Sequence, residues 1–211
     1  MDAIDTDHVS DKKVFAINIL RERHLNNFKA AARGRTDAGV RRYMSDDSWW
    51  SLGQHYGLAT PLIDWTESPY VAAFFAFHEE FHGDEGEAVV YSLSRPIIER
   101  RVEEVRRELG AEFDPGEVVR FLTPLQVDNA RLINQRGLFT ISPSEHCLEE
   151  WVRTYFQDSS DVPLLKIMIP RREKDTALRQ MNQMNINHLT LFPELGGASS
   201  YCNMQLGDRF Y

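Results

Sequence analysis

The sequence predicts an α+β fold, with a single domain in which a central mixed or antiparallel sheet is flanked by helices. Helix-like and strand-like segments are interspersed without a strict strand–helix–strand alternation, which argues against a parallel α/β architecture. The 211 residues, 42% of them hydrophobic and 27% charged, are enough for one domain with a full core. We place this domain at residues 14–211, behind a polar leader at residues 1–13.

Helix signals dominate the N-terminal part of the chain. Apolar residues and a histidine recur at helical spacing over residues 17–28 and predict an amphipathic helix that stops at Gly34. The side chains of Ser45 and Asp46 are good N-caps, so we expect a second helix to begin there and to end near Gly57.

A strand and a well-marked helix follow. The apolar run at residues 62–65 predicts a buried strand, and Ser68-Pro69 is typical of an N-cap with proline at the first helical position, opening a helix that ends near Phe81. Further strands are expected over residues 88–93, 118–122, 138–141 and 164–169, and further helices over residues 99–108, 130–135, 145–156, 173–184 and from 193 to the C-terminus. The tryptophans at positions 49, 50 and 65 are expected in the core more than at a binding site.

Charge and composition exclude several functions. Thirty-two acidic residues against 24 Lys and Arg give a net charge of −8, which disfavours a protein that tracks nucleic-acid phosphates. The acidic N-terminus lacks the features of a secretory leader, and the longest apolar run, Tyr70 to Phe77, is too short to span a bilayer. We therefore expect a soluble, cytoplasmic protein with no membrane contact. Cys147 and Cys202 are expected to be buried or half-buried thiols, and no spacing of Cys, His or carboxylates predicts a metal site.

The segment from Gly53 to Phe77 carries the strongest functional signal. A buried strand delivers Asp64, Trp65 and Thr66 to its C-terminal edge, where the next helix begins at Ser68. The unpaired N–H groups of that helix would face the same place as these side chains. The segment therefore predicts a polar pocket that holds a ligand with hydroxyls or phosphate.

Three motifs in order along the chain resemble those of a known family. Residues 54–66 read Q-H-Y-G-L-A-T-P-L-I-D-W-T and precede Ser68-Pro69, residues 131–140 read R-L-I-N-Q-R-G-L-F-T, and residues 191–197 read L-F-P-E-L-G-G. This pattern resembles the FRG domain, a bacterial family named for an N-terminal Phe/Tyr-Arg-Gly motif, and the resemblance runs from about Leu20 to the C-terminus. Members of the family tend to occur in genes suggestive of phage defence or of toxin systems.

The chain departs from the family pattern at four places. Ala59 replaces a proline, Pro61 replaces an arginine, and Glu194 replaces the aspartate of the closing motif. The Phe/Tyr-Arg-Gly motif itself is absent, and relative to the family the chain is expected to be short by one N-terminal strand and its arginine.

A second resemblance suggests a chemistry. Residues 65–76, W-T-E-S-P-Y-V-A-A-F-F-A, resemble the middle motif of ADP-ribosyltransferases, which hold NAD in a cleft between an N-terminal arginine or histidine, a S/T-x-S element and a later acidic residue. The resemblance implies that Thr66 and Ser68 hold the ribose, that His55 or Tyr56 lines the nicotinamide pocket, and that Gln135 stands where the acid is expected.

These resemblances imply roles in catalysis for His55, Thr66 and Gln135. They imply contacts with the cofactor NAD for a further seven residues, Gln54, Tyr56, Asp64, Trp65, Ser68, Arg131 and Phe139. A neutral glutamine amide can bind a ribose hydroxyl, but it cannot stabilise an oxocarbenium ion as a carboxylate does.

Each of these side chains also has a structural interpretation. Thr66 and Ser68 are good helix caps, Asp64 could pair with an arginine such as Arg131 if it is buried, and His55 could donate to a backbone carbonyl. Gln135 and Phe139 could hold a short helix to its strand.

Two functions from different classes remain open. The first is an FRG protein that binds NAD or a related nucleotide, as an ADP-ribosyltransferase-like toxin or phage-defence effector. The second is a catalytically inactive FRG module that contacts another protein in a defence, toxin–antitoxin or anti-defence system. The missing arginine and the missing acid favour binding over turnover.

Overall fold

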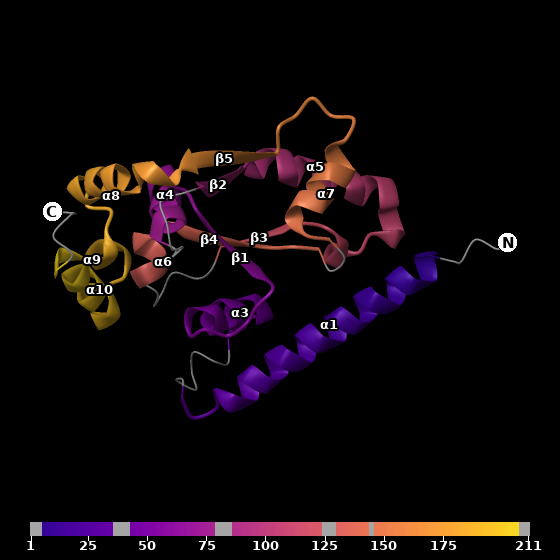
Figure 1. The fold of residues 1–211 in the computed structure, drawn as a ribbon. Coiled ribbons are helices and arrows are strands. Elements are labelled where there is room, and N and C mark those ends of the chain that lie inside the picture. Colours follow the sequence, from indigo (N-terminus) through magenta and orange to yellow (C-terminus); the bar gives the residue numbers. More distant parts are fainter. Residues whose placement is uncertain (1–5, 36–42, 79–85, 124–129, 144–145, 207–211) are drawn as a thin grey trace. The chain divides into compact units, whose positions relative to one another are not determined.

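The computed structural model describes the chain except for residues 1–5, 36–42, 79–85, 124–129, 144–145 and 207–211, and it has the predicted α+β fold (Figure 1). The α-helices are α1 (Thr6–Ala31), α3 (Asp46–His55), α4 (Pro69–His78), α5 (Arg95–Leu109), α6 (Ala130–Asn134), α7 (Leu148–Phe156), α8 (Lys174–Gln183), α9 (His188–Leu191) and α10 (Leu195–Leu206). The strands are β1 (Leu62–Thr66), β2 (Glu87–Leu93), β3 (Arg120–Leu122), β4 (Gly137–Ile141) and β5 (Leu164–Pro170). Short 3₁₀ turns lie at Gly110–Glu112, Pro115–Glu117 and Arg171–Glu173.

The strands are divided between two small sheets. One sheet has three strands in the order β1-β4-β3, and β3 runs antiparallel to β4 with Phe121 opposite Thr140. The other is the antiparallel pair β2 and β5, in which Val89 lies opposite Met168.

The chain divides into two compact units. The first comprises Met1–Ile63, Arg95–Pro124 and Phe139–Pro163, and the second comprises Asp64–Ser94, Leu125–Leu138 and Leu164–Tyr211. Because each unit is assembled from three separate stretches, neither is an independent segment of the sequence. Each is described by itself below.

In the first unit, α1 is longer and less buried than its pattern predicts. It begins at Thr6, inside the segment predicted as a leader, and of its predicted apolar stripe only Leu25 is buried, whereas Leu20 is 62% exposed. α1 contacts α3, whose Trp49 and Trp50 are buried, as expected of core residues.

The charged helix α5 and the aromatic helix α7 also belong to the first unit. Arg95 pairs with Glu99 one turn later at 2.8 Å on the solvated face of α5, and Ile98 is buried on the other face. Trp151 of α7 is fully buried, and its indole N–H donates to the carbonyl of Glu117 at 3.1 Å.

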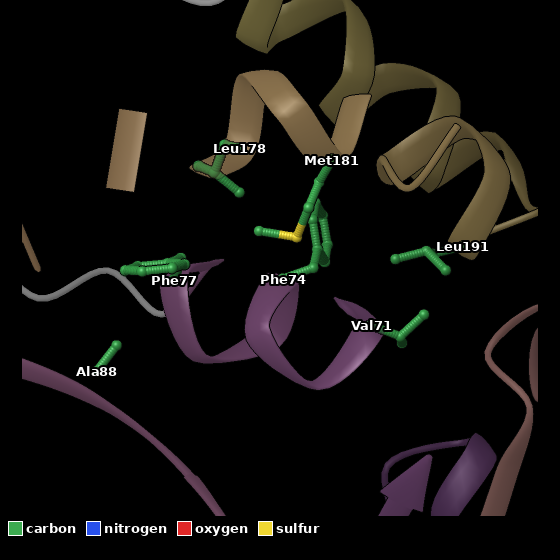
Figure 2. Close-up of a cluster of buried hydrophobic side chains, with 7 residues drawn as sticks. All are labelled: Val71, Phe74, Phe77, Ala88, Leu178, Met181 and Leu191. Atoms are coloured by element: carbon green, nitrogen blue, oxygen red, sulfur yellow. The ribbon is translucent and has the colours of Figure 1, made fainter. Parts of the chain in front are cut away.

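The second unit has its own apolar core. Figure 2 shows the apolar side chains of α4 facing those of α8 and α9. The cluster consists of Val71, Phe74, Phe77, Ala88, Leu178, Met181 and Leu191. This core explains why the Ala- and Phe-rich helix α4 has apolar residues at nearly every position, because α8 and α9 contact it as well as β2.

Three local predictions differ from the structure. The helix expected from residue 145 begins at Leu148, because Cys147 is the N-cap and its N–H donates to Oε2 of Glu150 at 3.0 Å. Cys147 and Cys202 are exposed, so the expectation of buried thiols was wrong. The strand expected from Val118 begins at Arg120.

The structure also adds a short helix, α9, which the sequence did not predict. Its N-cap, Asn187, accepts a hydrogen bond from the N–H of Thr190 at 3.1 Å, and Thr190 Oγ1 accepts one from the N–H of Asn187 at 3.2 Å. This reciprocal capping stabilises a helix of a single turn, which is too short for a periodicity signal.

Candidate functional site

The connection between β1 and α4 is organised by the two hydroxyls of the S/T-x-S element. Thr66 Oγ1 accepts a hydrogen bond from the N–H of Ser68 at 3.1 Å, and Ser68 Oγ accepts one from the N–H of Val71 at 3.4 Å. Ser68 is thus the N-cap of α4 and Pro69 its first helical residue, as predicted. Ser68 therefore caps α4, whereas Thr66 holds the capping residue in place through a turn.

This connection is bonded to the end of α6, which lies far away in sequence. Thr66 Oγ1 donates to the carbonyl of Gln135 at 2.6 Å, and the N–H of Glu67 donates to the carbonyl of Arg136 at 3.2 Å. The hydroxyl of Thr66 therefore both accepts and donates within the chain. The cap of α4 and the end of α6 are held at a fixed spacing.

The end of α6 is in turn bonded to α9. The side-chain amide of Gln135 donates to the carbonyl of Leu191 at 3.1 Å, and Asn134 Nδ2 donates to the carbonyl of Thr190 at 2.8 Å. The guanidinium of Arg131 lies 4.7 Å from the centre of the Phe192 ring.

The hydrogen bonds from Thr66 to Gln135 and from Gln135 to Leu191 join all three sequence motifs in the second unit. We call this set of bonds the three-motif junction. Gln135 is its central member, since its backbone carbonyl bonds one motif and its side chain bonds the other. Structural bonds thus occupy Thr66 and Gln135, two of the three residues to which the sequence assigned roles in catalysis.

The charge beside this junction is mixed. Arg136 pairs with Glu67 at 3.2 Å, and their side chains are 66% and 62% exposed, so the pair contributes little to stability. Arg136, which follows the end of α6, is also in the left-handed region at φ 49°. A Cβ at Gly137 would lie 2.5 Å from Cδ1 of Leu132, so any larger residue there would require the leucine side chain to move.

The remaining residues of the second unit that were predicted to contact NAD lie on β1. The side chain of Asp64 is exposed and that of Trp65 is partly buried. The premise that Asp64 is a buried carboxylate in need of a partner was therefore wrong, because its position in an apolar strand does not bury it.

Four residues of the predicted site belong to the first unit. Gln54 Oε1 accepts a hydrogen bond from Thr60 Oγ1, and the ring of His55 meets that of Tyr56 edge-on at 4.8 Å. Tyr56 is 73% exposed, whereas Phe139 on β4 is buried with 5% exposure. Phe139 thus has the position of a core residue.

A pair of histidines in the second unit was missed by the sequence analysis. Nε2 of His188 lies 3.1 Å from Nδ1 of His78, and His188, which is 4% exposed, packs against Phe74 and Phe192. The pKa of His188 is lowered from 6.5 to about 4 by burial, and to a smaller extent by the charge of His78. The two residues are 110 positions apart, so no local spacing could reveal the pair.

The described part of the chain has neither a metal-binding cluster nor a membrane-spanning helix. No group of three or more His, Cys, Asp or Glu side chains in that part of the chain is arranged to hold a metal ion. No helix there is long and apolar enough to cross a bilayer.

These features define an α+β protein whose motif residues meet in a hydrogen-bonded junction. The family model of the FRG domain matches residues 6–85, so the chain carries an FRG domain, as its central motif predicted. The two later motifs lie outside the matched residues. No curated protein and no solved structure gives a significant match, so the resemblance to ADP-ribosyltransferases stays a prediction.

Proposed function

We propose that this FRG domain is a catalytically inactive binding module that acts by contacting another protein. The observation that supports this proposal is the three-motif junction. Thr66 and Gln135, which transfer chemistry would require at the substrate, bond to each other and to Leu191. The position expected for a carboxylate holds an amide that donates to a carbonyl, and this arrangement suits a structural role better than the stabilisation of a cation.

The sheet of β2 and β5 offers an apolar surface for a partner. Val89 and Tyr91 of β2 are 36% and 37% exposed, and Met168, opposite Val89, is 58% exposed. These three residues share one face of the sheet, which we call the β2–β5 face. Exposed apolar residues gathered in this way mark interaction surfaces. Among the described strands, β2 and β5 pair with each other and with no third strand, so each leaves one edge unpaired. Such an edge can accept a strand from a partner.

Site-specific photocrosslinking in the native host tests this proposal. A photoreactive phenylalanine analogue at Met168 or Tyr91 is expected to give a discrete adduct with one protein, while the same analogue at the exposed Asp175 of α8 gives none. Met168→Glu should abolish the adduct formed from position 91. No adduct from either sheet position, or the same adduct from position 175, would contradict the proposal.

A second candidate function is the binding of NAD at the start of α4. Its support is that Arg136 pairs with Glu67, the residue directly before the N-cap Ser68, which ties a guanidinium to the connection that opens α4. Helix N-termini and arginines together favour phosphate groups.

Calorimetric titration separates the two candidates. Nucleotide binding predicts heat on titration with NAD and with ADP-ribose at millimolar concentration, and a weaker affinity for Thr66→Ala and Arg136→Gln. No heat with the wild-type protein would exclude this second candidate and leave the protein-binding proposal untouched.

A further inference from the structure

The first unit contains a pocket that is distinct from the predicted NAD site, because none of its lining residues was predicted to act in catalysis or to contact NAD. It has a volume of about 260 Å³. The pocket is lined by Asn18, Arg21, Trp50, Pro61, Pro115, Gly116, Val118, Arg120 and Ile141. These residues come from α1, α3, β3, β4 and the segments between them, so the pocket is a feature of the tertiary fold.

The lining is positively charged although the protein is acidic. Arg21 and Arg120 line the pocket, and none of the lining residues is acidic, whereas the whole chain carries a net charge of −8. Burial lowers the pKa of the Arg21 guanidinium, which indicates that the protein holds this charge partly out of water.

A carboxylate outside the lining contacts Arg120, one of the two arginines of the pocket. Asp47, in the first turn of α3, lies 3.5 Å from the guanidinium of Arg120. Their side chains are 39% and 43% exposed, so this contact is weak and an anion in the pocket could displace it.

The rest of the wall is apolar. Trp50, Pro61, Pro115, Val118 and Ile141 form it, and Trp50 is only 7% exposed, so its ring is a fixed part of the fold. An apolar wall with a few converging polar groups is characteristic of small-molecule sites, although the volume lies just below their usual range of about 300–1,000 Å³. The ligand must therefore be small.

We propose that this pocket binds a small organic anion, whose phosphate or carboxylate group is held by Arg21 and Arg120 and whose apolar part lies against Trp50 and Ile141. Guanidinium groups bind both kinds of oxyanion through charge-assisted hydrogen bonds. The site is independent of the function proposed for the β2–β5 face.

The proposal can be tested with probes that separate the two parts of the ligand. Phenyl phosphate carries both an anion and a planar apolar body, inorganic phosphate carries the anion alone, and benzyl alcohol carries the ring without the charge. In calorimetric titrations of the full chain, phenyl phosphate should bind with a Kd of about 1 mM or lower, a range set by a ligand of about ten heavy atoms. The other two probes should bind at least about tenfold more weakly.

Matched variants assign the binding to this pocket. Arg21→Gln and Arg120→Gln should each weaken the binding of phenyl phosphate about tenfold, whereas Arg23→Gln, the same change at an exposed position of α1, should leave it unchanged. Asp47→Asn should strengthen it, because Arg120 is then released from its carboxylate partner. Misfolding of a variant would only weaken binding, so stronger binding by Asp47→Asn cannot be explained by a loss of folding.

Three results would overturn the proposal. They are a Kd above 10 mM for phenyl phosphate, equal binding of inorganic phosphate, and binding that does not respond to Arg21→Gln, Arg120→Gln or Asp47→Asn.

Discussion

Gly197 lies where α10 approaches α9 most closely, and its replacement by alanine tests the packing of the closing motif. A Cβ at this position would lie 1.9 Å from the carbonyl oxygen of Phe192 and 2.8 Å from that of His188. Ordinary van der Waals contact begins at 3.4 Å, so α10 would have to move about 1.5 Å away from α9. Both obstacles are backbone atoms, which no side-chain rotation can clear.

The neighbouring glycine is a matched control. A Cβ at Gly196 has no atom within 4 Å, and this residue is exposed on the same helix. Gly196→Ala is therefore expected to stabilise the protein by about 0.5–1 kcal/mol through helix propensity alone. Gly197→Ala gains the same helix propensity, but its methyl group overpacks the contact between α10 and α9. Overpacking lowers the free energy of unfolding by about 3 kcal/mol at the upper end of its usual range.

Chemical and thermal unfolding measure the difference. We expect Gly197→Ala to lower the free energy of unfolding by about 2–2.5 kcal/mol, which is the cost less the gain, and the Tm by about 4–10 °C, at about 2–4 °C per kcal/mol for a chain of this size. Gly196→Ala should raise both. If Gly197→Ala unfolded within about 1 kcal/mol of the wild type, the close packing of α10 on α9 described here would be refuted.

Three further predictions concern the second unit. Thr66→Val removes the hydroxyl that bonds Gln135 and should lower the free energy of unfolding by about 1–2 kcal/mol in urea denaturation. Ser68→Ala removes the N-cap of α4 and should cost about 1 kcal/mol in the same assay. The pKa of His188 is lowered to about 4 in the folded state, so the unfolded state binds the proton more readily. Its contribution to stability should be complete above pH 6.5 and be lost towards pH 4 by up to about 1.4 kcal/mol per pH unit, and His188→Asn should flatten this dependence. Equal slopes for wild type and variant would contradict it.

The elements with local signals were predictable from the sequence. Ser45 and Ser68 are N-caps within the spans expected for α3 and α4, because capping depends on residues three or four positions apart. The β2 and β5 strands were also predicted, from short apolar runs next to Gly86 and Pro170.

The arrangement of the strands was not predictable in the same way. β2 and β5 are separated by the seventy residues 94–163, and the sequence expectation of one central sheet gave no reason for them to form a sheet of their own. Strand pairing is decided by long-range packing, here by the core around Phe74 and Met181, and not by the pattern within a strand.

The candidate site was likewise predictable in its local features and not in its long-range contacts. Its motif residues were identified from the sequence, and the capping role of Ser68 was among the alternatives, whereas Thr66, also interpreted as a cap, bonds the N–H of Ser68 instead. The bond from Thr66 to Gln135 joins residues 69 positions apart, and the pair of His78 and His188 joins residues 110 apart. Neither contact can be recognised from the spacing of neighbouring residues in the sequence.

The central claim is that the motif residues hold the fold together and do not turn over NAD. The most direct test is the release of nicotinamide from NAD by the purified wild-type protein, with cell lysate supplied as a source of acceptors. We predict no release above the protein-free control, together with the loss of stability in Thr66→Val that the bond to Gln135 implies. Nicotinamide released by the wild type and abolished in a folded Thr66→Val variant would contradict the account.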